Sequence, residues 1–176
     1  MLKPTKILKI NTVYDGWLKL KQAEVLLPNS NRMTYTYAEK SDGVIVLGIT
    51  EDKKVPVVKQ FRVPPQRFFI ELPAGLMEDG ETPEQTALRE LEEESGYKAK
   101  SITKLAEIYP TTGIMNFKIH IFFAEKLEKT KQKLDPTEFI ETDLMSIEQL
   151  EQLVNKGNID SGVALAFLYA KHKGLI

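Results

Sequence analysis

Cysteine is absent from the 176-residue chain. Disulfide bridges, zinc sites with thiolate ligands and thiol nucleophiles are therefore excluded. Histidine is scarce: His120 lies in an apolar stretch and is interpreted as structural, and His172 lies at the polar end of the last predicted helix. Neither has a serine or a second ligand at the spacing of a catalytic triad or a zinc site, so both arrangements are disfavoured.

Long apolar runs and an excess of one charge are also missing. No stretch approaches the ~20 apolar residues of a membrane span, and the lysine-bearing N-terminus lacks the apolar run of a signal peptide. The 24 basic and 25 acidic residues give a formal net charge of −1, which produces no overall attraction to nucleic acid or an anionic membrane. We therefore expect a cytoplasmic protein without a nucleic-acid or membrane partner. A lysine-rich segment lacks the interleaved aromatics of a nucleic-acid surface and is interpreted as a solvated loop: Lys126, Lys129, Lys131 and Lys133.

Alternating polar and apolar residues predict strands along most of the chain. Hairpin strands are expected in about the first forty residues, where Asp-Gly and Pro-Asn mark turns. The later elements are predicted as two strands within 41–62, a strand at 68–75, a helix at 83–95, strands at 98–109, 117–127 and 138–146, and helices at 146–157 and 160–174. The strand at 117–127 is nearly continuous in apolar residues and is expected at the centre of the sheet. This order predicts an α/β fold, in which a mixed sheet has helices on its faces.

The segment 75–97 carries an unusual excess of negative charge. Arg89 is its one basic residue, against eight carboxylates: Glu78, Asp79, Glu81, Glu84, Glu90, Glu92, Glu93 and Glu94. Carboxylates at helical spacing repel one another, so we expect a positive species to bind there.

The middle of this segment has the signals of a helix. Thr82 is the expected N-cap, Pro83 takes the first helical position and Gln85 completes a capping box. Gly96 is expected to end the helix in the left-handed conformation.

Three carboxylates are expected on one face of this helix. At about 100° per residue, Glu90, Glu93 and Glu94 fall within an arc of roughly 100°. The adjoining arc, expected to pack on the sheet, holds Ala87, Leu88 and Leu91. Hard oxygen ligands on a rigid scaffold predict a site for Mg²⁺, with Mn²⁺ as the alternative metal. A solvated acidic helix is the other interpretation.

The segment 75–97 resembles the Nudix box, Gly-x5-Glu-x7-Arg-Glu-U-x-Glu-Glu-x-Gly-U, in which U is a bulky apolar residue. Every fixed position agrees, and Tyr97, an aromatic residue at an aliphatic place, is a mild departure. The flanking stretches "VVKQFRVPPQRFFIELPAG" and "YPTTGIMNFKIHIFFA" resemble the ADP-ribose pyrophosphatase branch of the Nudix hydrolases. The resemblance covers roughly residues 14 to 172 and is weakest across 20–40.

The resemblance implies a Nudix α/β/α sandwich at 43–176 and a small N-terminal antiparallel β-sheet at 1–42. The N-terminal sheet would form a homodimer and help to bind the base. The implied reaction is Mg²⁺-dependent hydrolysis of a small-molecule nucleotide sugar, ADP-ribose or a close relative, to AMP and ribose 5-phosphate. Two alternatives stay open: a pyrophosphatase for GDP-mannose or another nucleoside diphosphate sugar, and a non-catalytic Nudix sensor that binds ADP-ribose.

The resemblance also assigns roles within the box. Glu90 and Glu94 would be the principal metal ligands, assisted by Glu93 and by the carbonyl of Ala74. Arg89 would belong to the catalytic machinery by orienting these carboxylates. Three further residues would shape the box: Gly75, Glu81 and Gly96.

The general base is implied to lie outside the box. Glu138, in "DPTEFIE", best matches the family's glutamate in the loop before the last strand, and Glu141 is the second candidate. Without the resemblance, Glu138 would be interpreted as a surface residue of the loop.

Substrate binding is implied at four further positions. Arg62 is placed like the family's phosphate-binding arginine, and Glu71 like the residue that meets the ribose side. Trp17 and Tyr35 are placed like the aromatics that stack on adenine, supplied partly across a dimer. The alternatives are ordinary strand-end charges for the first two residues and simple packing for the aromatics.

Overall fold

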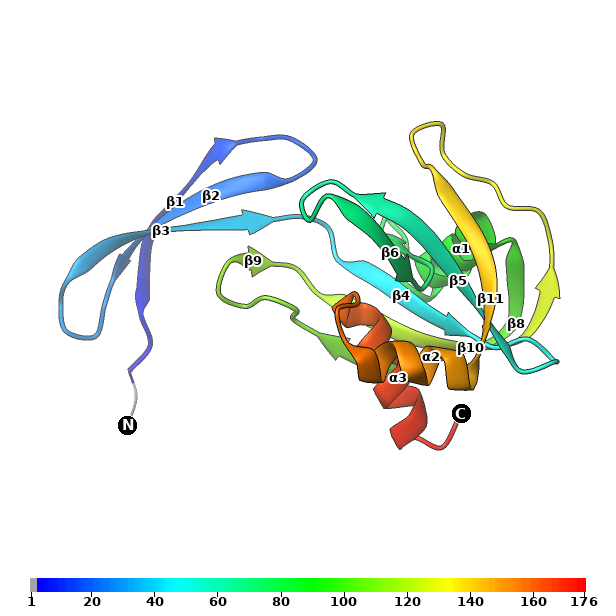
Figure 1. Ribbon diagram of the computed structural model, residues 1–176. Coiled ribbons are helices and arrows are strands. Elements are labelled where there is room, and N and C mark those ends of the chain that lie inside the picture. Colours follow the sequence, from blue (N-terminus) through cyan, green and yellow to red (C-terminus); the bar gives the residue numbers. More distant parts are fainter. Residues whose placement is uncertain (1–2) are drawn as a thin grey trace. The chain divides into compact units, whose positions relative to one another are not determined.

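The computed structural model describes residues 3–176 and divides the chain into two compact units (Figure 1). The N-terminal unit contains the residues up to Ser41 together with Tyr109–Lys118. The main unit contains Asp42–Ile108 and Ile119–Ile176. The chain therefore returns to the N-terminal unit once, in a segment far from it in sequence.

The N-terminal unit is a four-stranded sheet in the order β1-β2-β3-β9. Strands β1 (Lys6–Tyr14), β2 (Lys19–Leu26) and β3 (Arg32–Glu39) form an antiparallel meander, as the turn signals predict. Strand β9 (Met115–Asn116) pairs in parallel with β3. Local pattern did not predict β9, because a two-residue strand has no periodicity of its own.

The central sheet of the main unit has the order β7-β4-β10-β8. Strand β10 (Ile119–Lys129) lies between β4 (Gly43–Gly48), which runs parallel to it, and β8 (Tyr97–Ile108), which runs antiparallel. Strand β7 (Ala74–Leu76) pairs antiparallel with β4 at the edge. The expected mixed sheet is confirmed, as is the central place of the most apolar strand.

A second sheet of the main unit is antiparallel throughout, in the order β11-β5-β6. Its strands are β11 (Ile140–Ser146), β5 (Lys54–Arg62) and β6 (Arg67–Glu71). In the hairpin of β5 and β6, Arg62 pairs with Arg67 and Glu71 pairs with Val58, and the Arg62 side chain reaches along the sheet to Glu71.

Helices cover both faces of the central sheet, as Figure 1 shows: α1 (Pro83–Ser95), α2 (Ile147–Lys156) and α3 (Ser161–His172). Ile45 and Leu47 of β4 pack with α2 and α3, whereas Val44 and Val46 pack with α1. Alternate residues of one strand thus enter two cores, which confirms the predicted α/β/α sandwich. In residues 3–176, no helix has both the length and the apolar composition needed to cross a bilayer.

The predicted bounds of α1 are confirmed. Gln85 donates its backbone N–H to Thr82 Oγ1 and returns the bond through its side chain, and Gly96 follows with a φ of 70°. The predicted burial of Leu88 is wrong, since this side chain is 36% exposed. Thr86, which was not predicted in the packed face, is fully buried, and its hydroxyl donates to Glu81 Oε2 at 2.8 Å.

Candidate active site

Arg89 is at the centre of the charged residues of α1 and the loop before it. Its Nε and Nη2 donate to the two carboxylate oxygens of Glu81 at 2.9 and 3.0 Å. Its Nη1 donates to Glu90 Oε1 at 2.7 Å and to Glu93 Oε2 at 3.1 Å. The Arg89 guanidinium holds the pKa of Glu81 down to about 2. One arginine therefore pairs with three carboxylates and fixes their side chains.

Glu90 and Glu94 are both buried, and Glu94 is only 3% exposed. Burial is the largest cause that raises the pKa of Glu90, and it raises the pKa of Glu94 to about 8. The negative charge of Glu138 raises both pKa values further. Glu94 Oε2 accepts a hydrogen bond from the Ala74 backbone N–H at 2.8 Å. Negative charge is thus unfavourable here unless a cation is present.

Gly75 lets α1 approach strand β7 closely. A Cβ atom at this position would lie 1.9 Å from Glu90 Oε1, so any side chain would displace the carboxylate. The absence of a side chain therefore creates the space in which the Glu90 carboxylate lies beside the backbone of β7. This requirement explains a glycine in the middle of a strand.

The donors of this region fit a hard divalent cation. Glu90 and Glu94 are buried carboxylates with raised pKa values, and a bound cation would lower these pKa values and stabilise the ionised side chains. Across residues 3–176, no group of three or more acidic or histidine side chains is already arranged as a formed metal site. Glu90 and Glu93 are both paired with the Arg89 guanidinium.

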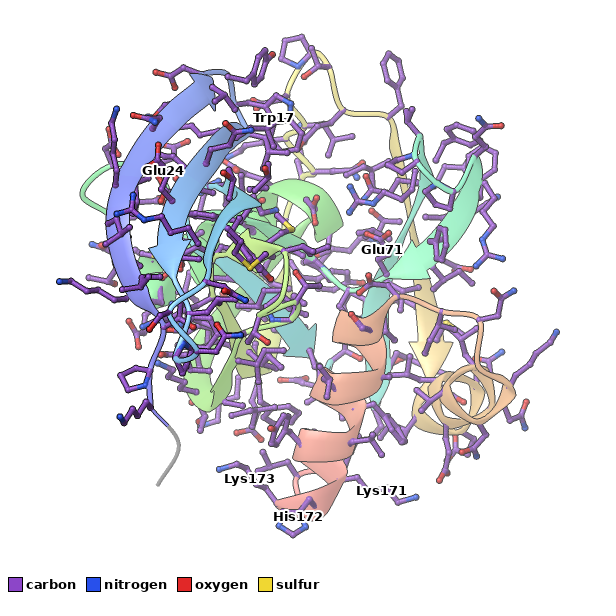
Figure 2. The ribbon with its side chains drawn as sticks, turned by 90° about the vertical axis from the view of Figure 1, so that its left-hand side faces the viewer. Trp17, Glu24, Glu71, Lys171, His172 and Lys173 are labelled. Carbon is purple, nitrogen blue, oxygen red and sulfur yellow. The ribbon has the colours of Figure 1, made fainter. Side chains whose placement is uncertain are left out.

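Arg62 and Glu71, predicted separately as substrate-binding residues, form one ion pair. Arg62 donates from Nε to Glu71 Oε1 at 2.8 Å and from Nη2 to Oε2 at 2.5 Å, and Gln60 also donates to Oε2 at 3.0 Å. The bond to Glu71 is the largest cause that raises the pKa of Arg62, and the charge of Glu94 contributes. The Arg62 side chain is nevertheless half exposed, whereas that of Glu71 is buried. Figure 2 shows Glu71 at the end of its strand.

The two candidate bases differ in their surroundings. Glu138 lies in the loop before β11, accepts from the Asp135 backbone N–H at 3.1 Å, and acts electrostatically on the buried carboxylates of α1. Glu141 lies within β11 opposite Lys59, pairs with its Nζ at 3.4 Å, and has a side chain that is 81% exposed. Of the two, Glu138 is the one whose charge acts on Glu90 and Glu94.

Comparison with known proteins identifies the family of this chain. The model of the NUDIX domain matches residues 39–166. The chain belongs to the Nudix family. It is 40% identical over 153 residues to the ADP-ribose pyrophosphatase of Bacillus subtilis, covering 85% of this chain and 83% of that protein. It is 32% identical over 168 residues to the methanol dehydrogenase activator of Bacillus methanolicus, covering 93% of this chain and 91% of that protein.

A solved structure confirms the Nudix fold over nearly the whole chain. The crystal structure of an ADP compounds hydrolase superposes with a TM-score of 0.84 and covers 99% of this chain and 97% of its own. Its sequence identity is 20%, so the likeness concerns the fold. Nudix hydrolases generally use divalent metals, which agrees with the carboxylate-rich box.

The predicted base-binding aromatics of this Nudix chain lie apart in the N-terminal sheet. Trp17 lies in the turn between β1 and β2 and is 78% exposed (Figure 2). Tyr35 lies on β3 opposite Ala23, whereas the residues next to the turn pair Lys19 with Glu39. Four residues of strand separate those two pairs, which corresponds to about 13 Å. One subunit therefore does not bring both rings to the same place.

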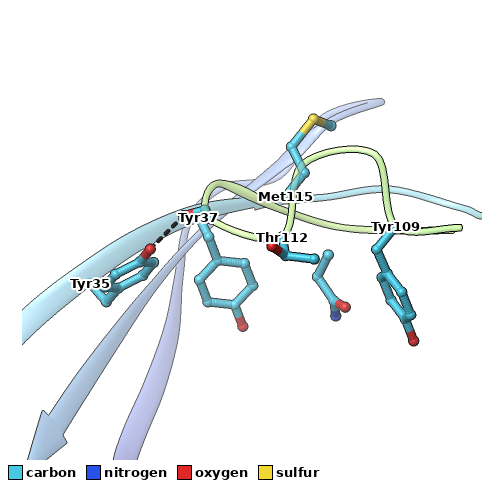
Figure 3. A pocket seen from close by; sticks show the side chains of 7 residues that line it. Tyr35, Tyr37, Tyr109, Thr112 and Met115 are labelled. Atoms are coloured by element: carbon cyan, nitrogen blue, oxygen red, sulfur yellow. Dashed lines mark hydrogen bonds between the residues drawn. The ribbon is translucent and has the colours of Figure 1, made fainter. Parts of the chain in front are cut away.

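Tyr35 lines a pocket of about 310 Å³ within the N-terminal unit (Figure 3). Its lining residues are Tyr35, Tyr37, Tyr109, Thr112, Gly113, Met115 and Asn116. The Tyr35 hydroxyl donates to the backbone carbonyl of Gly113, which ties β3 to the returning segment. Sequence reasoning missed Tyr37 and Tyr109 as pocket residues. The alternation of β3 places Tyr37 on the face of Tyr35, but no local signal brings Tyr109 there.

Neither histidine belongs to the charged cluster of α1. His120 is buried in β10, with Nδ1 at 3.4 Å from Glu107 Oε2 and Nε2 at 3.8 Å from Asp42 Oδ2. His172 lies in the last turn of α3 between Lys171 and Lys173, as Figure 2 shows.

Proposed function

We propose that the protein hydrolyses the pyrophosphate bond of ADP-ribose to AMP and ribose 5-phosphate in the presence of Mg²⁺. The observation that carries this proposal is the buried pair Glu90–Glu94 beside the Arg89–Glu81 ion pair, in a complete Nudix box. The relatives support the substrate class, since the one that is 40% identical is an ADP-ribose pyrophosphatase. Closely related nucleoside diphosphate sugars are the neighbouring candidates.

Mg²⁺ would be held by Glu90 and Glu94, with Glu93 and the Ala74 carbonyl completing the protein's ligands. When bound, the metal neutralises charge on the diphosphate and lowers the pKa of a water that it holds. Mn²⁺ has the same ligand preference and is the alternative. The protein's own part is to keep the carboxylates in place, which Arg89 does through its bonds to Glu90 and Glu93.

The remaining residues take up binding and proton transfer. Glu138 accepts the proton from the attacking water. Its charge acts on both buried carboxylates, which supports this assignment. Arg62 binds a phosphate oxygen, since its side chain stays half exposed beside Glu71. Glu71 orients Arg62 through two hydrogen bonds and so acts on the substrate indirectly.

A panel of nucleotide sugars tests this proposal. The wild type is incubated with Mg²⁺ and ADP-ribose, other ADP-sugars or GDP-mannose, and the products are separated by chromatography. We expect AMP and ribose 5-phosphate from ADP-ribose. A higher kcat/KM for GDP-mannose would favour the alternative pyrophosphatase. Binding of ADP-ribose without any product, at any metal concentration, would favour the non-catalytic sensor.

Gly75→Ala tests the metal site without removing a ligand. The added methyl group would push the Glu90 carboxylate away from β7, because the Cβ would lie 1.9 Å from Glu90 Oε1. We expect the affinity for Mn²⁺, measured by electron paramagnetic resonance, to fall by about 10- to 100-fold. Circular dichroism should remain that of the wild type. Unchanged Mn²⁺ binding would contradict the placement of Glu90 as a ligand.

A homodimer formed through the N-terminal sheet is the second part of the proposal. Large apolar side chains stay exposed on this sheet and its turn, among them Ile7, Ile10, Val13, Tyr14, Trp17, Met33 and Tyr35. A partner subunit would cover such a surface. It would also bring Trp17 of one subunit to the base bound by the other. Within a single subunit, Trp17 and Tyr35 lie too far apart to contact the same base. Sedimentation of the full chain as a monomer would contradict this arrangement.

Trp17→Ala is expected to weaken binding of the base. Stacking an adenine on an aromatic ring contributes about 1–3 kcal/mol, so KM for ADP-ribose should rise by about 5- to 150-fold. The activity should fall mainly through KM, since the ring would contact the base and not the reacting phosphorus. Tryptophan fluorescence of the wild type should respond to ADP-ribose, because Trp17 is the chain's single tryptophan. If the fluorescence did not respond to ADP-ribose and the KM of Trp17→Ala were unchanged, Trp17 would have only a structural role in the turn.

A further inference from the structure

The loop between β10 and β11, residues 130–139, is docked on the C-terminal end of α1. Its lysine side chains were expected to be solvated, yet the backbone of the loop is held by hydrogen bonds. The bonds run from Thr130 N–H to Gly96 O at 2.8 Å, from Lys133 N–H to Glu93 O at 2.9 Å, and from Gln132 Nε2 to Glu94 O at 2.7 Å. The carbonyls of a last helical turn have no partners within the helix, so they are free to accept these bonds.

Two side chains converge on one acceptor in this contact. Gln132 Nε2 donates to the carbonyl oxygen of Glu94, and Thr142 Oγ1 donates to the same oxygen at 3.0 Å. Gln132 also donates to Thr142 Oγ1 at 3.0 Å, so the two anchors bond each other. Glu138 lies between them in sequence. Both ends of the chain around the candidate base are thus fastened to the residue whose carboxylate is the candidate metal ligand.

Between the anchors, the backbone is also held by the Lys133 N–H, which donates to Glu93 O at 2.9 Å, and by β11, which pairs with β5 from Ile140 onward. Glu138 itself is held within its own turn. Its backbone N–H donates to the Asp135 carbonyl at 2.9 Å and its carboxylate accepts from the Asp135 N–H at 3.1 Å, so these contacts stay inside the loop. They shape the turn but do not set its distance from α1. The placement of the carboxylate relative to Glu90 and Glu94 therefore depends on what fastens the loop as a whole.

We propose that Gln132 and Thr142 are positioning residues that hold Glu138 at the site through the Glu94 carbonyl. This inference rests on the proposed function, in which Glu138 accepts a proton from the attacking water. A base must stay within hydrogen-bond reach of that water, and a displacement of about 1 Å can cost about 100-fold in rate. Because the loop is fastened to the helix that bears the metal ligands, the position of Glu138 relative to Glu90 and Glu94 stays fixed.

The competing explanation is that the two bonds simply cap the helix. A cap acts on the stability of α1, and through Glu94 it would act on metal binding. A positioning role acts on kcat and requires Glu138. The two explanations therefore differ in which measured quantity changes and in whether the change depends on the base.

The test compares five variants with the wild type in ADP-ribose hydrolysis. Gln132→Met with Thr142→Val removes both donors, Thr142→Ser keeps the hydroxyl, and Thr130→Val is the matched control. The hydroxyl of Thr130 is buried and has no hydrogen-bond partner within the described residues, so its loss removes no anchor. We expect the double variant to lower kcat by about 10- to 100-fold with KM and Mg²⁺ affinity nearly unchanged. Thr130→Val should match the wild type, and Thr142→Ser alone should as well.

The fourth variant, Glu138→Gln, decides how the anchors act. In its background the double substitution should have little further effect, since the base that the anchors hold is already gone. Hydrogen exchange without metal or substrate should show faster exchange of the amides at 133–139 in the double variant, and Thr130→Val should again match the wild type.

Three results would overturn the inference: a wild-type kcat in the double variant, the same loss of kcat on top of Glu138→Gln, or unchanged exchange at 133–139. A wild type that hydrolyses no nucleotide sugar would overturn the proposed function instead. The exchange measurement would then decide by itself whether the anchors hold the loop.

Discussion

Glu94→Gln is expected to lower kcat by at least about 100-fold at saturating Mg²⁺ while the protein stays folded. The amide keeps the size of the side chain and still has an oxygen to accept the bond from the Ala74 N–H. It loses the negative charge that a divalent cation requires. Steady-state kinetics over a Mg²⁺ titration would measure the loss, and far-ultraviolet circular dichroism would verify the fold. An unchanged kcat would remove Glu94 from the metal site.

The same substitution should stabilise the metal-free protein, and increasingly so as the pH rises. Burial raises the pKa of Glu94 to about 8 from an ordinary value of 4.5, so between these values the folded state keeps a proton that the unfolded state has lost. The free energy of unfolding of the wild type therefore falls as the pH rises through this window, and the fall levels off above about 8. Glutamine cannot titrate and escapes this loss.

Thermal unfolding in the presence of a chelator would measure the effect. The Tm of Glu94→Gln minus that of the wild type should be small near pH 5 and larger near pH 8. Glu84→Gln is the matched control, since Glu84 is an exposed carboxylate in the first turn of the same helix. Its Tm difference should stay nearly constant over the same range. A Glu94→Gln difference that shrinks with rising pH would contradict the raised pKa.

Helix α1 shows how much the sequence could predict. Its bounds follow from neighbouring residues: a capping box at Thr82 and Gln85, a proline at the first position and Gly96 at the end. The shared face of the carboxylates follows from helical geometry alone. These signals are local, so they can be recognised without knowing the rest of the fold.

The sequence could not predict how the helix is pressed against its surroundings. The raised pKa of Glu94 depends on burial against β7, and that approach depends on the missing side chain of Gly75. The exposure of Leu88 likewise reflects the tertiary packing of the helix and not its pattern. Burial is a property of the assembled fold, so periodicity indicates a face but not its degree of desolvation.

Contacts between distant segments were equally hidden. Arg62 and Glu71 were predicted as two independent binding residues, and the hairpin of β5 and β6 makes them one ion pair. Tyr109 enters the N-terminal unit because the chain returns there, and the docking of residues 130–139 on α1 joins segments nearly 40 positions apart. No sequence pattern around a hydrogen-bonding side chain such as Gln132 predicts its partner.

Glu138→Gln is expected to lower kcat by about 100- to 10,000-fold, with little change in KM. A general base acts on the proton in the transition state and contributes little to binding of the ground state. Glutamine keeps the shape of the side chain, so it could still accept from the Asp135 N–H and preserve the loop. The substitution therefore removes the base and leaves its position intact.

Glu141→Gln is the matched control, because Glu141 is the other acidic candidate of the same segment and pairs with Lys59 on an exposed strand. It should retain nearly all of the wild-type kcat. The opposite result, a large loss in Glu141→Gln and none in Glu138→Gln, would move the base three residues along the chain. The Thr142 side chain faces α1, where it donates to Glu94 O, and side chains of neighbouring strand residues point to opposite faces, so Glu141 points away from α1. For Glu141 to act as the base, its ion pair with Lys59 would have to open and β11 would have to shift. The charge that Glu138 already exerts on Glu90 and Glu94 requires no such rearrangement.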